Sequence, residues 1–327
     1  MRGTIRLIVQ SIHLKYEMEF SRNITILKGN SATGKTTLVD MIQEYNLNGP
    51  DTGINLSCSC PCRVIAGNTW SEQLEQIHDS LVFIDEGNRF VSSKAFAGII
   101  QETDNYYVIV TRESLSTLPY SVTEIYGIRS AGKFASQEPV YHHMYRIYGD
   151  YNLQESCGLV KLVVEDSNAG YDFFKGISAK KDITCISANG AGNIFEILQA
   201  ADSRESITVI ADGAAFGAQM EKVYQVLLRK PEIRLYLPES FEWMILSSGI
   251  LRDNEVQDIL EHPSEYIESR NYFSWERYFT HLLIARTADT YMKYTKTKLN
   301  PVYLHGRVCE QIIAAMPEML KNKFLEP

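Results

Sequence analysis

The feature that most constrains this chain is the stretch Gly29-Asn30-Ser31-Ala32-Thr33-Gly34-Lys35-Thr36, which satisfies the pattern G-x-x-x-x-G-K-[ST]. A short apolar run at 24–27 precedes it. Apolar residues at helical spacing follow it, namely Leu38, Val39, Met41 and Ile42. The pattern therefore predicts a buried strand that turns sharply into a helix, as in a parallel α/β sheet.

Such a turn binds anions, because its backbone N–H groups point inward and the helix N-terminus adds partial positive charge. Gly29 and Gly34 permit the backbone geometry, and Lys35 reaches the β- and γ-phosphates of a nucleotide. Thr36 is expected to ligand Mg²⁺. We predict an ATP site formed by residues 29–36 together with Thr37. A glycine-rich turn with a solvated lysine is the alternative.

Two acids follow an apolar run at 81–84. A strand buried on both faces ends at the carboxyl edge of a parallel sheet, where ligands bind, so Asp85 should lie beside the phosphate loop and hold Mg²⁺ directly or through water. Glu86 is then placed to polarise the water that attacks the γ-phosphate. The alternative is an acidic N-cap for the next helix.

Another apolar strand, 106–110, ends in Thr111 and Arg112. If it inserts between the two motif strands, Thr111 lies near the γ-phosphate. This order resembles the additional-strand, catalytic-glutamate division of P-loop NTPases, which includes the AAA+, RecA-like and ABC ATPases. The resemblance covers about residues 1–130 and implies catalytic roles for Lys35, Glu86 and Thr111. Arg112 is a weaker candidate, and no ABC signature lies between the motifs, so the subclass stays open.

The second half alternates strands and helices again, which predicts a second parallel sheet. Two of its strands end in acids, so Glu165 and Asp212 are expected on one carboxyl edge, where they can share a second divalent metal. Glu239 follows the next strand and is a further candidate ligand.

Residues 158–245 resemble the Toprim domain of topoisomerases, primases and the overcoming-lysogenisation-defect nucleases, and the Toprim-like partners of anti-phage ATPases. The matching positions are Glu165, the turn at 187–190, and Asp212. Toprim catalysts carry Asp-x-Asp after the third strand, whereas this chain has Asp212-Gly213-Ala214. A two-metal mechanism needs more carboxylates. We therefore favour a binding or regulatory Toprim-like domain over an active nuclease.

The predicted organisation is a P-loop ATPase domain at 1–150, a Toprim-like α/β domain at 157–250 and a helical C-terminal extension at 251–327. Basic residues alternate with tyrosines between positions 286 and 298 of this extension. They suit a nucleic-acid backbone, although a solvated helix surface explains them equally well.

The chain has 327 residues, 45% of them apolar, and a net charge of −8, which argues against a broadly basic nucleic-acid surface. It contains no apolar run of about 18 residues, so we expect a cytoplasmic protein without membrane contact. Its six cysteines do not suggest a disulfide framework. Reduced thiols are the favoured interpretation of Cys58, Cys60 and Cys62, with a metal site as the alternative.

Together these features predict a protein that binds and hydrolyses ATP and couples this to a Toprim-like domain, in nucleic-acid metabolism or anti-phage defence. An ATP-controlled, metal-dependent nuclease and a phage or plasmid DNA-handling motor are the alternatives. Nucleic acid, further copies of the chain or a protein partner are the expected partners.

Overall fold

A computed structural model describes residues 1–29, 33–131, 140–149, 160–202 and 204–325. The chain forms two compact units, Met1–Gly149 with His262–Ser274, and Asp150–Glu261 with Trp275–Pro327. The first segment of the first unit ends at Gly149, and the domain boundary expected from the sequence is residue 150. The predicted extension at 251–327 is divided instead: most of it belongs to the second unit, while 262–274 belongs to the first.

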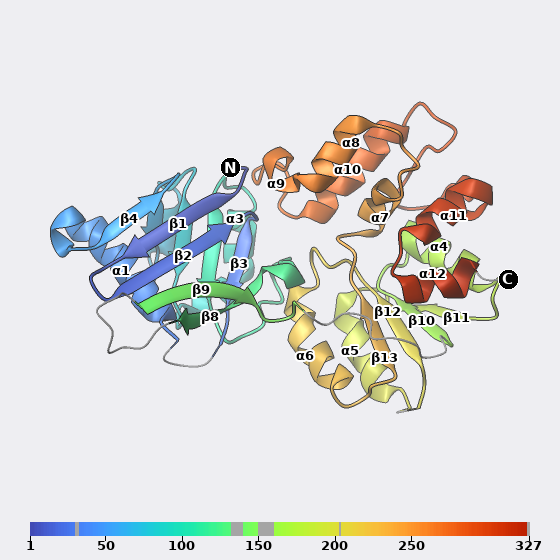
Figure 1. Ribbon diagram of the computed structural model, residues 1–327, viewed down its shortest axis with the longest axis horizontal. Coiled ribbons are helices and arrows are strands. Elements are labelled where there is room, and N and C mark those ends of the chain that lie inside the picture. Colours follow the sequence, from blue (N-terminus) through green and yellow to red (C-terminus); the bar gives the residue numbers. More distant parts are fainter. Residues whose placement is uncertain (30–32, 132–139, 150–159, 203, 326–327) are drawn as a thin grey trace. The chain divides into compact units, whose positions relative to one another are not determined.

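The first unit contains a large mixed sheet (Figure 1). Its strands follow the order β4-β1-β2-β9-β8-β3-β7-β6-β5. Their bounds are β1 (Ile5–Gln10), β2 (Leu14–Phe20), β3 (Ile24–Leu27), β4 (Asn55–Cys58), β5 (Cys62–Val64), β6 (Leu81–Ile84), β7 (Tyr106–Val110), β8 (Ile125–Ala131) and β9 (Val140–Arg146).

Strands β1 and β2 pair antiparallel as a hairpin. Strand β4 lies within the polar and turn-rich stretch 46–61 and pairs with β1 at the edge of the sheet. Its residues alternate between exposed and half-buried. An edge strand of this kind carries little apolar signal, which is why hydrophobic periodicity misses it.

The centre of this sheet is parallel, and β7 lies between β3 and β6, as the sequence predicts. In the register, Leu27 of β3 pairs with Val110, and Ile84 of β6 pairs with Ile109. The carboxyl ends of the three strands therefore meet at one edge of the sheet, where the loop after β3 and the acids after β6 emerge.

Both faces of these strands are covered. The helices of this unit are α1 (Lys35–Asn48), α2 (Trp70–Leu74), α3 (Lys94–Ile100) and α9 (Pro263–Tyr266), with 3₁₀ turns η1 (Gly49–Thr52), η2 (Arg89–Ser92) and η3 (Val122–Glu124). Leu38 and Ile42 of α1 share a core with Phe83 of β6. Tyr107 contacts Phe96 of α3 edge-on, with 6.1 Å between the ring centroids.

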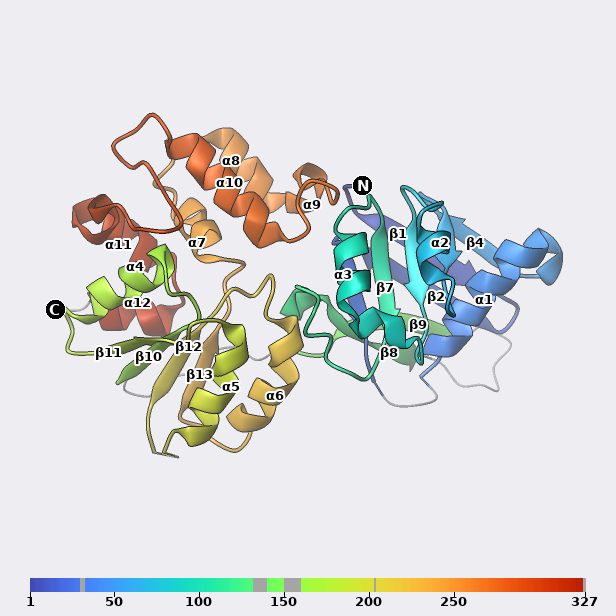
Figure 2. The same cartoon turned by 180° about the vertical axis from the view of Figure 1, so that it is seen from behind.

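The second unit is built on a parallel sheet, as predicted, with the order β11-β10-β12-β13. Its strands and crossover helices are β10 (Lys161–Val164), α4 (Ala169–Ser178), β11 (Thr184–Ser187), α5 (Ala191–Ala200), β12 (Ile207–Ile210), α6 (Gly217–Leu227) and β13 (Ile233–Tyr236). Helices α5 and α6 lie on one face and α4 on the other (Figures 1 and 2). Right-handed crossovers require this arrangement for such a strand order.

The C-terminal part is helical, as predicted. It comprises α7 (Phe241–Ser247), α8 (Asn254–Glu261), α10 (Trp275–Thr287), η4 (Pro301–Leu304), α11 (Gly306–Ala314) and α12 (Glu318–Leu325). Phe279 and Leu283 of α10 are buried, whereas Ile284 is 40% exposed. Among the described helices, we find none with the length and apolar character needed to cross a bilayer.

Candidate functional site

The predicted phosphate loop connects β3 to α1, and α1 begins at Lys35. Asn30, Ser31 and Ala32 lie outside the described residues. Gly29 has φ 126° and Gly34 has φ 86°. Side chains with a Cβ rarely adopt these values, so the turn requires glycine at both positions.

Lys35 reaches back over this loop. Its side chain is buried, and Nζ donates to the carbonyl of Gly29 at 3.1 Å and to Oγ1 of Thr33 at 2.8 Å. Burial lowers the pKa of Lys35, while the carboxylates of Glu86 and Asp85 oppose that shift. The ammonium group is therefore held over the loop and interacts electrostatically with the two acids.

The two sequence motifs meet at Thr36 and Asp85. Thr36 Oγ1 lies 3.5 Å from Asp85 Oδ1. A hydroxyl and a carboxylate are hard oxygen donors of the kind that Mg²⁺ prefers. The donor set therefore fits the Mg²⁺ of a bound Mg-nucleotide. Thr37 follows on the exposed side of α1.

Glu86 and Thr111 lie at the same edge of the sheet. Glu86 forms an ion pair with Arg112, in which Arg112 Nε lies 2.8 Å from Glu86 Oε1. Both side chains are exposed. The Thr111 N–H donates to the Leu27 carbonyl at 3.2 Å. Arg112 is only a weaker candidate from the sequence, yet it contacts the expected catalytic carboxylate directly.

Sequence reasoning missed the aromatic support of the loop. Tyr16 and His142 stack with 4.5 Å between ring centroids, and the Tyr16 hydroxyl donates to the Gly34 carbonyl at 2.9 Å. His142 is buried and His143 is exposed, consistent with their predicted opposite orientations along β9. A strand tyrosine carries no local sign that it holds a loop from another part of the sheet.

Changing Gly34 to alanine should weaken nucleotide binding by about 10-fold or more, because the loop then changes shape. A Cβ at this position would lie 2.7 Å from the Tyr16 hydroxyl, in a backbone conformation with φ 86°. Titration with a fluorescent ATP analogue measures the effect. Gly98→Ala is the matched control, since its Cβ meets nothing within 4 Å. Unchanged affinity in Gly34→Ala would contradict this role of the loop.

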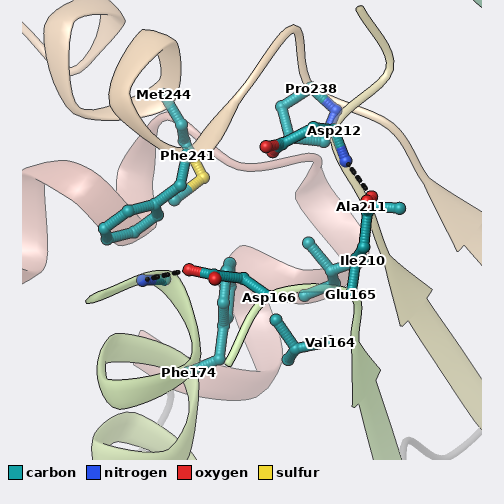
Figure 3. A pocket seen from close by; sticks show the side chains of 11 residues that line it. Val164, Glu165, Asp166, Phe174, Ile210, Ala211, Asp212, Pro238, Phe241 and Met244 are labelled. Atoms are coloured by element: carbon teal, nitrogen blue, oxygen red, sulfur yellow. Dashed lines mark hydrogen bonds between the residues drawn. The ribbon is translucent and has the colours of Figure 1, made fainter. Parts of the chain in front are cut away.

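In the second unit, the structure brings Glu165 and Asp212 together at the carboxyl edge, as predicted. The Asp212 N–H donates to Glu165 Oε2 at 3.0 Å (Figure 3). Glu165 follows β10 and Asp212 follows β12, which are neighbouring strands. The chain continues from β10 to β11 on one side of the sheet and from β12 to β13 on the other side. This is the switch point at which open α/β sheets bind ligands.

Asp166 lies beside this pair and caps α4. Its carboxylate accepts the N–H groups of Ser167 at 2.7 Å, Asn168 at 2.9 Å and Gly170 at 3.0 Å (Figure 3 shows the last). Glu165, Asp166 and Asp212 line one cavity of about 20 Å³ with apolar neighbours such as Phe241. The capping role considered for Asp166 from the sequence is the one the structure shows.

Both partners of the pair bind protons more tightly than ordinary acids. Burial raises the pKa of Glu165 to about 7. Burial also raises the pKa of Asp212 well above its usual range, and the carboxylates of Glu276, Glu165 and Glu242 add to this rise. Burial and the neighbouring carboxylates therefore both favour the protonated form of these two acids.

The third expected ligand does not join them. Glu239 contributes its backbone carbonyl to the Ala214 N–H at 3.2 Å and does not line the cavity. Within the described ranges, no group of three or more His, Cys, Asp or Glu residues is arranged to hold a metal ion. The predicted set Glu165, Asp212 and Glu239 therefore does not converge.

The same finding applies to the cysteine cluster. Cys58 Sγ and Cys60 Sγ are 3.8 Å apart, and the five described cysteines are free thiols. Hydrogen bonds from Cys60 and Cys62 lower the pKa of the Cys58 thiol. Cys58 ends β4 and Cys62 begins β5.

The basic and tyrosine residues of the C-terminal part do not form one surface. Arg286 pairs with Asp253 and Glu255, and Lys296 pairs with Glu276. Tyr294 is buried, whereas Tyr291 is 73% exposed. These residues therefore differ in burial and in their ionic partners.

Comparison of the chain with protein-family models, curated proteins and solved structures gave no match.

Proposed function

We propose that the first unit binds and hydrolyses Mg-ATP. The observation that carries the proposal is the approach of Thr36 Oγ1 to Asp85 Oδ1, 3.5 Å apart, across a strand inserted between the two motif strands. Two sequence motifs with complementary roles toward a nucleotide are brought together by the sheet. The alternative, a glycine-rich turn that binds no ligand, does not explain why Thr36 and Asp85 lie so close together.

Each residue has a distinct role in this proposal. Backbone N–H groups of the loop and the ammonium of Lys35 bind the phosphates, and Thr36 and Asp85 hold the Mg²⁺, which neutralises phosphate charge. Glu86 orients and polarises the attacking water, and Arg112 fixes the Glu86 carboxylate from one side. Thr111 contributes a polar group at the tip of β7.

For the second unit we propose a binding or regulatory Toprim-like role, controlled by the nucleotide state of the first. Support comes from the parallel sheet with Glu165 and Asp212 at its switch point, and from the failure of Glu239 to join them. Nucleic-acid metabolism or anti-phage defence, in the cytoplasm and with a protein partner or further copies of the chain, is the proposed setting. A nuclease or DNA-handling motor would need metal-dependent cleavage or translocation.

The test is phosphate release from ATP by the purified chain, with Mg²⁺ and with EDTA. Wild-type protein should release phosphate only with Mg²⁺. Asp85→Ala should raise the Mg²⁺ concentration needed for half-maximal rate by about 10-fold, because a residue that positions the metal is lost. Asp51→Ala, an exposed acid in η1, is the control. Absence of Mg²⁺-dependent turnover in wild type would contradict the proposed function.

A further inference from the structure

A lysine lies among the carboxylates of the second unit. Lys296 Nζ forms an ion pair with Glu276 Oε1. Its segment is fixed beside α4, because the Ala169 N–H donates to the Lys296 carbonyl at 3.0 Å and the Leu299 N–H to Asp172 Oδ2 at 3.3 Å. The Lys296 ammonium therefore lies near the carboxyl edge of the sheet, where Glu165 and Asp212 are found.

The same segment satisfies a second acid. Glu242 of α7 is 2% exposed, and its Oε1 accepts the hydroxyl of Tyr294 at 2.8 Å. A buried carboxylate is costly without a partner. The residues from Tyr294 to Lys296 therefore supply one hydroxyl and one positive charge to a set of acids contributed by β10, β12, α7 and α10.

The divalent metal implied by the Toprim resemblance does not fit this set. The cavity of about 20 Å³ has room for about one water, whereas Mg²⁺ in proteins keeps several waters. The Asp166 carboxylate is already used by three backbone N–H groups, and Glu165 Oε2 accepts the Asp212 N–H. These bonds already use part of the oxygen lone pairs that an octahedral shell would need.

We propose that Lys296 is the resident counter-ion of this carboxylate cluster, defined as Glu165, Asp212, Glu242 and Glu276, and that the second unit works without a divalent metal. The positive charge that a Toprim catalyst takes from metal is here part of the chain. The inference concerns the second unit alone and holds whether or not the first unit hydrolyses ATP.

The electrostatics of Lys296 agree with this geometry. Burial lowers the pKa of Lys296, but the carboxylates of Glu242 and Glu276 outweigh burial, and Asp212 acts in the same direction. The net result is a raised pKa, so the ammonium stays charged at neutral pH. Lys296 in turn lowers the pKa of Asp212, against the larger effect of burial.

The first experiment titrates nucleotide-free full-length protein with Mn²⁺ and follows free Mn²⁺ by electron paramagnetic resonance. Wild type and Asp212→Asn should give the same binding curve up to millimolar Mn²⁺, because Asp212 holds no metal. A site present in wild type and lost in Asp212→Asn would overturn the proposal. This comparison needs no change at Lys296, so it does not depend on how well a lysine variant folds.

The second experiment removes the counter-ion. Lys296→Met should melt about 3 to 5 °C below wild type, since acids lose their partner. Mn²⁺ should leave the melting temperature of Lys296→Met unchanged, because the cavity has no room for a hydrated ion. Lys296→Arg keeps the charge and should behave as wild type, as should Lys298→Met, an exposed lysine of the same segment. If Lys296→Met melts like wild type, Lys296 is not the counter-ion, and a melting temperature that rises with Mn²⁺ would show that the site accepts a metal.

Discussion

Replacing Lys35 with alanine should reduce phosphate release from ATP at least about 100-fold, the largest loss we expect from a single change. The Lys35 ammonium is held over the loop by Gly29 and Thr33, so its charge is positioned before a nucleotide arrives. Charge that develops on the transferred phosphoryl group would then be stabilised without reorganisation of the site. Coupled-enzyme detection of phosphate at saturating Mg-ATP measures the loss.

The control must separate lost chemistry from lost folding, because Lys35 is only 6% exposed and its hydrogen bonds support the loop. Lys94→Ala, an exposed lysine at the start of α3, should keep wild-type turnover. Melting curves of both variants check the fold. Wild-type turnover in a folded Lys35→Ala protein would remove the loop from the proposed ATP site.

The elements that sequence reasoning predicts well are those whose signal is local. Residues 24–27 and 38–42 show the strand and the helix around the loop, and the acids after 81–84 mark the end of a strand. Strand β7 reads as buried on both faces in the same way, which places it inside the sheet, whereas its position between β3 and β6 is what the resemblance to P-loop NTPases implies. In these segments, the pattern of apolar residues alone indicates which residues are buried.

The contacts that escape prediction join residues distant along the chain. The sequence indicates only that Tyr16 belongs to a strand. The fold shows that its hydroxyl donates a hydrogen bond to the Gly34 carbonyl. Lys296 reads as one of several basic residues near the C-terminus, yet it pairs with Glu276 and faces acids from other elements. Glu239 shows the converse: it follows a strand at the right place, but its side chain does not join the expected pair.

Changing Glu86 to glutamine should slow ATP hydrolysis by about 100-fold or more while ATP binding stays within about 3-fold of wild type. The glutamine keeps the size of the side chain and an oxygen that accepts from Arg112 Nε, now 2.8 Å from the carboxylate. What it loses is the negative charge that polarises the attacking water. Binding is measured with a fluorescent ATP analogue and turnover by phosphate release, on the same preparation.

This split between binding and turnover distinguishes Glu86 from Lys35 and Asp85, whose roles are to hold phosphate and metal. Glu44→Gln, an exposed acid on α1, removes one negative charge elsewhere in the same unit and should change neither quantity. If Glu86→Gln weakens binding and turnover in proportion, Glu86 positions the nucleotide through Arg112 instead of activating water. If it changes neither, the acid that activates water is another residue, and Glu86 is an ordinary surface partner of Arg112.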